Sequence, residues 1–317
     1  MNNKPQKQKG LDALRGMGII GIVIYHLFPA ILPGGFLGVP LFFVLSGYLM
    51  FVTSETSWQK GTFHIRSYYK KRIRKIIPSL FTMVMVICTY LTLIQSSLLT
   101  GIRQEICSIF LGYENWWQIG QNASYFSRLS EASPFTHLWF LAVEIQFYLL
   151  WPFVCLLYKK MCQFFNGRKM CFLFLLLALL SAGRMFLLHT PGGDPSRVYY
   201  GTDTMAFPLL IGIFLGALRE QYDRLCFSIS KKASLILLGI FVLTIITLFF
   251  TVDGQNNFLY PGGMFLISLL FAVMIQMIVN QEEDLGNLLE NTALSFLGKK
   301  SYGIYLWHYP LIILGLL

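Results

Sequence analysis

Nine runs of mostly apolar residues, each about 20 residues long, constrain the fold of this 317-residue chain more than any other feature. A helix needs about 20 such residues to cross a hydrocarbon core of about 30 Å. The chain is 55% hydrophobic and 13% charged, which is too apolar for a soluble domain. We therefore predict an all-α, polytopic transmembrane bundle of about nine to ten spans, forming one domain over residues 1–317. The runs cover residues 11–29, 36–53, 78–99, 135–158, 170–188, 204–219, 233–251, 261–280 and 296–317.

The distribution of Lys and Arg predicts how the chain is oriented, because short cytoplasmic loops are enriched in these residues. With nine crossings and a cytoplasmic N-terminus, 20 of the 25 Lys and Arg residues fall in the predicted cytoplasmic segments. Residues 102–119 contain Arg103, Glu105 and Glu114, and we interpret them as interfacial or re-entrant, since a crossing there would invert every later loop. The net charge of +10 reflects topology and attraction to anionic lipid, so we expect the bilayer and no nucleic acid as a partner.

Two basic side chains, Arg15 and His26, interrupt the first apolar run. Such residues normally face a protein interior or a watery cavity, because their insertion costs about 2.5 kcal/mol or more. An offset of eleven residues returns a helix to within about 20° of the same face, about 16 Å further along. Arginine suits a phosphate or carboxylate, and histidine exchanges protons near neutral pH. The alternative is structural: an Asp12–Arg15 pair that orients the helix, and a hydrogen-bonded buried His26.

The segment PGGFLGVPLFFVLSGYLM places Ser46 and several glycines in the second run. Glycine allows a tight turn and close packing of the helix that follows. The segment predicts either a tight helical hairpin or a direct part in a catalytic site.

The densest basic segment runs from Lys60 to Pro78 and includes Arg66, Arg72 and Arg74. Most basic segments beside a membrane set orientation and bind lipid headgroups. The three arginines equally suit the phosphates of a nucleotide-bearing donor.

The span HLWFLAVEIQFYLLWP holds His137 and Glu144 seven residues apart. Two helical turns put both on one face, about 10 Å apart. Glu144 is a candidate to orient an imidazole such as His26, as acid–base sites require. A structural carboxylate, bound to Trp or Tyr donors, is the alternative.

The predicted outer loop RVYYGTDTMAF gathers Tyr199, Tyr200 and Asp203. These hydroxyls beside a carboxylate are candidates to contact a sugar or to relay an acyl group. A capped helix start explains Asp203 equally well. In the last span, His308 is a candidate substrate contact, although Trp307 and Tyr309 also suit an interfacial aromatic belt.

The six cysteines lie in or beside apolar runs and lack the CxxC spacing of zinc sites and redox pairs. We expect them to be small buried side chains, and we expect no metal cofactor.

Taken together, six segments resemble the acyltransferase-3 family of bacterial membrane acyltransferases, over nearly the whole chain. They are LDALRG with a later His, GGFLGV with FFVLSGYL, the Arg-rich segment before Pro78, HLWFLAVEIQFYLLWP, YYGTDT with LLIG, and LGKKSYGIYLWHYP. The second and fifth segments are most similar to the branch that O-acetylates peptidoglycan. Two departures stand out: Met205 replaces the usual arginine after YGTDT, and Pro40 follows Gly-Val where an acidic residue is common.

The resemblance implies a multi-pass enzyme of the bacterial cytoplasmic membrane that transfers an acyl group, usually acetyl from cytoplasmic acetyl-CoA. The implied acceptor is a hydroxyl of an envelope glycan such as peptidoglycan or exopolysaccharide. It further implies that Arg15 and His26 are the paired basic residues needed for activity, that Arg72 and Arg74 lie near the donor, and that the outer-loop tyrosines receive or pass on the acyl group. A separate extracytoplasmic transferase or esterase partner would complete the transfer where no such domain is attached.

Two other functions remain open from the residues alone. Intramembrane Arg, His and Glu also mark proton-coupled transporters, although these commonly contain repeated halves and the sequence shows none. A glycan- or lipid-binding scaffold without catalysis is suggested by Met205, whereas His26 argues against it.

Overall fold

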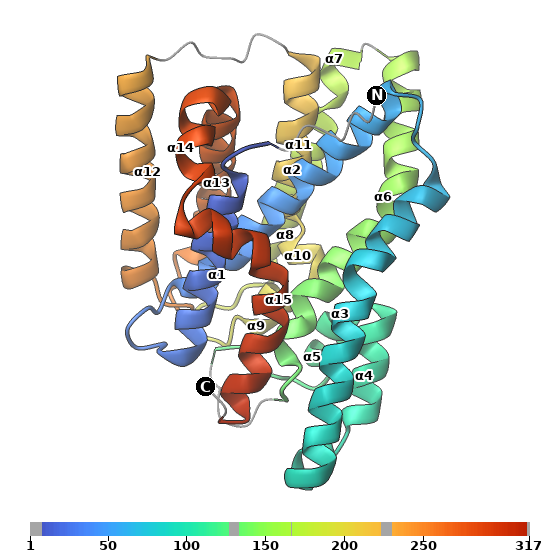
Figure 1. The fold of residues 1–317 in the computed structure, drawn as a ribbon, viewed down its shortest axis with the longest axis vertical. Helices are drawn as coiled ribbons and strands as arrows, with labels where there is room; N and C mark the ends of the chain where they lie inside the picture. The colour runs from blue at the N-terminus through green and yellow to red at the C-terminus, as the bar shows by residue number, and fades with distance from the viewer. Residues whose placement is uncertain (1–7, 127–132, 166, 223–229, 316–317) are drawn as a thin grey trace.

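The computed structural model describes residues 8–126, 133–165, 167–222 and 230–315 of the chain. Every regular element in these ranges is helical, and the chain is a polytopic helical membrane protein, as predicted. The long helices run up and down one bundle (Figure 1). They are α1 (Leu11–Leu27), α2 (Gly38–Gln59), α3 (Ile65–Ile94), α6 (Trp139–Phe164), α8 (Phe172–Leu188), α11 (Phe207–Gln221), α12 (Lys231–Thr251), α13 (Met264–Asn280) and α15 (Ala293–Ile313).

Each predicted apolar run coincides with one of these long helices. Within the part of the chain that the structure describes, six helical stretches are long and apolar enough to cross a membrane. They contain α2, α3, α6, α11, α12 and α13. The others are α1 and α8, at 17 residues each, and the more polar α15. The count of nine crossings and the cytoplasmic N-terminus stay predictions.

The segment 102–119 forms two short helices, α4 (Ile102–Leu111) and α5 (Glu114–Gly120). At 1.5 Å per residue, they are about 15 and 10 Å long, so neither can cross a bilayer alone. Both lie beside the end of α3 opposite its start (Figure 1). This agrees with leaving the segment out of the crossing count.

Short helices and single turns join or extend the long helices. The α-helical ones are α7 (Gly167–Met170), α9 (Ser196–Tyr200), α10 (Thr202–Met205) and α14 (Asn287–Glu290). The remaining turns are Gly35–Leu37, Ser96–Leu99, Thr136–Leu138, Leu259–Gly263 and Glu282–Gly286.

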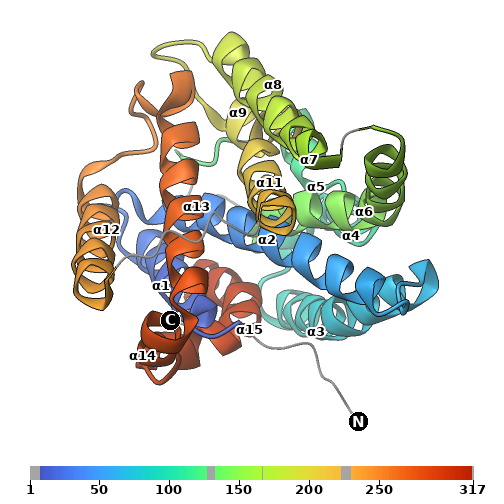
Figure 2. The same ribbon diagram turned by 90° about the horizontal axis from the view of Figure 1, so that it is seen from above.

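Close helix packing positions the centre of the bundle. The helix α2 runs between α8 and α11 on one side and α1, α3 and α15 on the other (Figure 2). A Cβ atom on Gly298 of α15 would lie 1.7 Å from the carbonyl oxygen of Asp12, and one on Gly16 of α1 would lie 1.9 Å from that of Leu294. Only glycine fits at both positions, so α1 and α15 approach backbone to backbone.

Candidate active site

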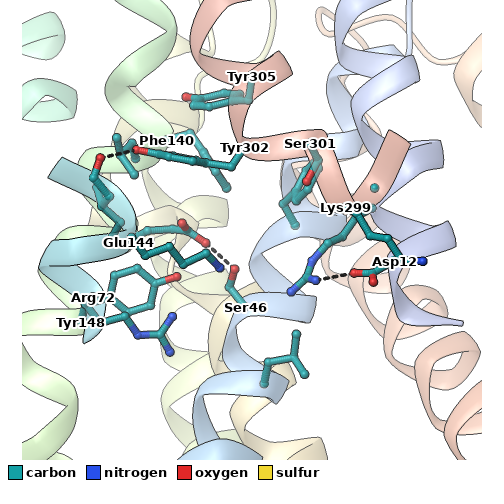
Figure 3. Close-up of a pocket in the computed structure, with 17 residues that line it drawn as sticks. Asp12, Ser46, Arg72, Phe140, Glu144, Tyr148, Lys299, Ser301, Tyr302 and Tyr305 are labelled. Carbon is teal, nitrogen blue, oxygen red and sulfur yellow. Dashed lines mark hydrogen bonds and ion pairs between the residues drawn. The ribbon is translucent and has the colours of Figure 1, made fainter. Parts of the chain in front are cut away.

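A cavity of about 330 Å³ opens at the centre of the bundle, among α1, α2, α3, α6 and α15 (Figure 3). Its charged lining residues come from the first turns of α1, from α3, from α6 and from the start of α15. They are Asp12, Arg15, Arg72, Lys75, Glu144 and Lys299. Four cations against two carboxylates give the lining a net positive charge. Such a cavity favours an anionic ligand.

Three of the four cations of the cavity make defined contacts. The guanidinium of Arg15 donates to Asp12 Oδ1 at 2.8 Å, which is the predicted pair. The guanidinium of Arg72 lies 4.4 Å from the ring centroid of Tyr148 and 5.5 Å from that of Tyr68, which are cation–π contacts. Lys299 pairs with Glu290 at 2.9 Å.

Glu144 lies in this cavity and not against His26. The hydroxyl of Ser46 donates to Glu144 Oε1, and both side chains lie near Arg72 (Figure 3). No contact between Glu144 and His26 occurs among the described residues. The prediction that Glu144 orients His26 is therefore not matched by the structure, because the carboxylate faces the cavity, two helical turns from the turn Thr136–Leu138 that carries His137.

Tyr305 lies between the cavity and a cluster of histidines. Its ring lines the cavity, and its hydroxyl donates to the carbonyl oxygen of His137. One helical turn further along α15, His308 Nδ1 lies 2.8 Å from the carbonyl oxygen of Tyr305. His308 thus follows Tyr305, a residue of the cavity lining, by about 5 Å along α15.

Backbone carbonyls decide which ring nitrogens of His26 and His308 carry hydrogen, because a carbonyl can only accept. In the neutral rings, His308 Nδ1 donates to Tyr305, and His26 Nδ1 donates to the carbonyl of Ile22 at 2.9 Å. The Nε2 of His308 is then an acceptor, and it lies 3.2 Å from His26 Nδ1. The Nε2 of His26 keeps its lone pair, and it lies 3.5 Å from the hydroxyl of Tyr125. This arrangement presents a base to a phenol.

Aromatic rings enclose the two histidines. The ring of His137 packs 5.5 Å from that of His308, and Tyr309 packs 4.9 Å from His26. All three histidines are buried. Among the described residues, no group of three or more His, Cys, Asp or Glu side chains is placed to hold a metal ion.

The tyrosines of the predicted outer loop lie behind Tyr125. The ring of Tyr125 is 4.8 Å from that of Tyr199 and 5.8 Å from that of Tyr200. Both are fully buried; the hydroxyl of Tyr199 donates to the carbonyl of Phe36 at 3.2 Å, whereas that of Tyr200 has no hydrogen-bond partner. A buried hydroxyl without a partner is costly. Tyr200 is therefore a candidate for a transient contact.

Asp203 forms an ion-pair cluster apart from the cavity. Its carboxylate binds Arg197 through two contacts of 3.1 Å, and Arg184 through a third. The neighbouring Met205 is fully buried in the core, at the position where the family usually carries arginine. The cluster stabilises the α9–α10 loop. Asp203 does not line the central cavity.

The three predicted donor-binding arginines do not share one environment. Arg72 lines the cavity, whereas Arg66 and Arg74 are exposed and line none of the described cavities. The physical reason is helical geometry, because Arg74 lies about 200° around the helix from Arg72, and Arg66, six residues earlier, lies about 120° from it. Lys75, three residues after Arg72, faces the cavity instead and was missed.

Two other residue groups were missed by sequence reasoning. Tyr125 lies in a loop without periodicity, so only its contact with His26 marks it. The carboxyls of Glu105 and Glu114 form a buried pair on α4 and α5, joined by Gln118, whose amide donates to Glu105 at 3.4 Å and also to Glu114. Burial raises the pKa of both, to about 7 for Glu105 and further for Glu114. The sequence signal for this pair was two glutamates near Gln118, which follows Glu114 by four residues and so lies on the same helix face.

Comparison with known proteins covers nearly the whole chain. Residues 8–315 match the family model described as an acyltransferase domain. The chain is 37% identical over 310 residues to the peptidoglycan O-acetyltransferase OatA of Listeria monocytogenes, covering 96% of this chain and 49% of that protein. It is also 37% identical over 316 residues to the O-acetyltransferase OatA of Staphylococcus aureus, covering 98% and 51%. The chain therefore spans about half the length of the curated relatives it matches. No solved structure matches it.

Proposed function

We propose that this chain, which belongs to the acyltransferase-3 family, works in the bacterial cytoplasmic membrane and moves an acetyl group out of the cytoplasm. The donor is cytoplasmic acetyl-CoA, and the acceptor is a hydroxyl of an envelope glycan such as peptidoglycan or an exopolysaccharide. The names of the relatives support an acetyl group and a glycan acceptor.

The central cavity suits the donor. Arg15, Arg72 and Lys75 supply positive charge for its phosphates, and Phe140 and Tyr305 supply apolar walls for its pantetheine arm. Two of the cavity's lining residues, Lys75 and Lys299, belong to predicted cytoplasmic segments, where the donor is available. The thioester then reaches toward Tyr305, the residue next to the histidines.

The transfer itself needs one base. Nε2 of His26 takes the proton from a hydroxyl, whose oxygen bonds to the thioester carbon. The carbon–sulfur bond breaks, and the coenzyme A thiolate leaves and recovers a proton from the imidazolium. The hydroxyl at His26 belongs to the glycan or to a relay tyrosine, for which Tyr125 and Tyr200 are the candidates. His308 Nε2 and the carbonyl of Ile22 share the single Nδ1 hydrogen of His26, and together they position the base.

One observation carries this proposal: Tyr305 lines the cation-rich cavity, and its carbonyl oxygen binds the histidine that contacts His26. Tyr305 and His308 thus connect the proposed donor site with the proposed general base. Arg15 lies at the proposed donor site, and His26, eleven residues later on α1, is the proposed base.

The test is acetyl transfer in inside-out membrane vesicles that carry the full chain. Radiolabelled acetyl-CoA is added outside, and label is measured in glycan, with and without an added extracytoplasmic transferase or esterase partner. We expect label with the unchanged chain and none with His26→Ala, while donor binding is kept. No label in glycan with the unchanged chain, or label that crosses as free acetate, would instead support a scaffold or a transporter. Equal label in both chains would show that His26 is not the base.

A further inference from the structure

A cavity of about 200 Å³ lies against α4 and α5, the short helices beside the far end of α3 (Figure 1). The start of α3 belongs to the predicted cytoplasmic segment, so this cavity lies at the predicted outer end of the bundle. No step of the proposed reaction uses it. We name it the outer cavity, after six of the residues that line it: Glu105, Trp117, Gln118, Gln121, Ser124 and Ser133.

The outer cavity differs in charge from the central cavity. Among the described residues that line it, Glu105 is the one ionisable side chain, and none is Lys or Arg. Without a cation, the cavity offers no counter-charge to a phosphate or a carboxylate. Burial raises the pKa of Glu105 to about 7, so this carboxyl holds a proton at lower pH. The lining therefore suits a neutral ligand.

Hydroxyl and amide groups make up most of this lining. Gln118 donates to Glu105 Oε1 at 3.4 Å, and Ser133 donates to Oε2 of the same carboxyl at 2.6 Å. These contacts hold one polar wall in place, whereas Gln121 is exposed at the cavity. The half-buried Trp117 adds apolar surface beside the polar groups. A sugar ring matches this combination, because its faces carry C–H groups and its edge carries hydroxyls.

Two segments of the chain connect the outer cavity with the histidine cluster. Ser124 lines the cavity and immediately precedes Tyr125, whose hydroxyl lies 3.5 Å from His26 Nε2. Thr136 also lines it and immediately precedes His137, one of the three clustered histidines. Consecutive Cα atoms lie only about 3.8 Å apart. The same backbone segments therefore contribute to the wall of the cavity and to the surroundings of the proposed base.

We propose that the outer cavity binds one neutral sugar ring of the acceptor glycan, with Trp117 against a face of the ring and Gln118 and Gln121 on its hydroxyl or acetamido groups. This inference rests on the proposed function. Whole-ligand pockets usually exceed about 300 Å³, so a cavity of about 200 Å³ suits a single ring, and the rest of the glycan extends past the exposed Gln121. The cavity thus selects the acceptor independently of the donor.

The experiment measures binding and acetyl transfer with one neutral probe, chitotetraose, a soluble chain of four N-acetylglucosamine rings. The full chain is placed in nanodiscs, where both faces of the bilayer are open to added donor and acceptor. The variants are Trp117→Ala, Trp117→Phe and Gln121→Ala. Gln104→Ala is the matched control, because Gln104 is an exposed glutamine of α4 that lines none of the described cavities.

Trp117→Ala should bind chitotetraose about tenfold more weakly, because the apolar contact of the ring is lost, and Trp117→Phe should recover most of the binding. Gln121→Ala should weaken binding by about threefold to fivefold, as the loss of one hydrogen bond predicts. In acetyl transfer, both alanine variants should raise KM for chitotetraose by these factors and leave KM for acetyl-CoA unchanged. Gln104→Ala should change neither constant.

Equal binding by the unchanged chain, Trp117→Ala and Gln121→Ala would overturn the inference alone, since the glycan would then bind elsewhere. A rise of both KM values together would also overturn it, because it would show a general change in the fold. An unchanged chain that fails to bind chitotetraose would overturn the inference as well. Label in envelope glycan in the vesicle assay would then decide whether the proposed function also fails.

Discussion

The imidazole nitrogens of His26 and His308 lie 3.2 Å apart, although the two residues are separated by 282 positions in the chain. The carbonyl of Tyr305 holds His308 with its Nε2 as an acceptor. That acceptor faces Nδ1 of His26, so the second nitrogen of His26 is left as a base. The pair contains the two features of a general-base site, a free lone pair and a group that orients it.

Replacing His308 by phenylalanine should lower kcat for acetyl transfer by about tenfold, because one of the two acceptors that orient His26 is lost while the carbonyl of Ile22 remains. The KM for acetyl-CoA should stay within about threefold, since His308 does not line the cavity. In His308→Gln the amide oxygen can accept from His26 Nδ1, and this variant should recover most of the lost rate. Equal kcat losses in the Phe and Gln variants would show that His308 acts only through packing.

Glu144→Gln should leave kcat within about fivefold, because Glu144 lies against Ser46 and near Arg72, away from His26. The isosteric amide still accepts from Ser46. With one negative charge fewer in the cavity, acetyl-CoA should bind at least as tightly, which titration of the donor measures. A loss of kcat comparable to that of His26→Ala would instead restore Glu144 to the catalytic centre.

Gly298→Ala should destabilise the bundle by about 1–3 kcal/mol, because the new Cβ would lie 1.7 Å from the carbonyl of Asp12 and must push α1 from α15. The matched control is Gly303→Ala on the same helix, where no atom lies within 4 Å of the added Cβ. Alanine should raise or maintain stability there, by up to about 1 kcal/mol. Thermal unfolding in detergent compares the two, and equal melting temperatures would contradict the close approach.

The helices were predictable because a hydrocarbon core demands about 20 apolar residues, a property that is local in the sequence. Arg15 and His26 were predictable for a similar reason, since an ionisable residue inside an apolar run stands out. The contact between His26 and His308 was not predictable from the sequence, because it depends on how α1 and α15 align across Gly16 and Gly298.

The basic segment before Pro78 is an intermediate case. Its charge was evident, but the choice of Arg72 with Arg74 ignored that a helix rotates by about 200° in two residues. The same rule favours Lys75, about 60° from Arg72, which the cavity confirms as a neighbour. No comparable rule predicts that Tyr125 contacts His26, because Tyr125 lies in a loop whose position is set by packing against rings that are distant in the sequence.

The buried carboxyl pair on α4 and α5 should make stability depend on pH. Burial raises the pKa of Glu105 to about 7 and that of Glu114 further, so the folded protein holds protons that the unfolded chain releases above pH of about 4.5. Because the folded state then binds more protons, stability is greatest below the unfolded pKa and falls as pH rises. The slope is about 1.4 kcal/mol per pH unit for each proton held.

Melting temperature measured from pH 5 to pH 9 in detergent should therefore decline, and the decline should be smaller in Glu114→Gln. The amide of that variant cannot ionise, yet it can still accept from Ser108, which donates to Glu114 in the unchanged chain. Glu283→Gln is the control, because Glu283 is exposed and its replacement should leave the decline unchanged. A melting temperature that rises with pH would contradict this prediction. It would mean that both carboxyls are ionised in the folded protein and are stabilised by a positive charge, which the buried contacts of Glu105 and Glu114 do not supply.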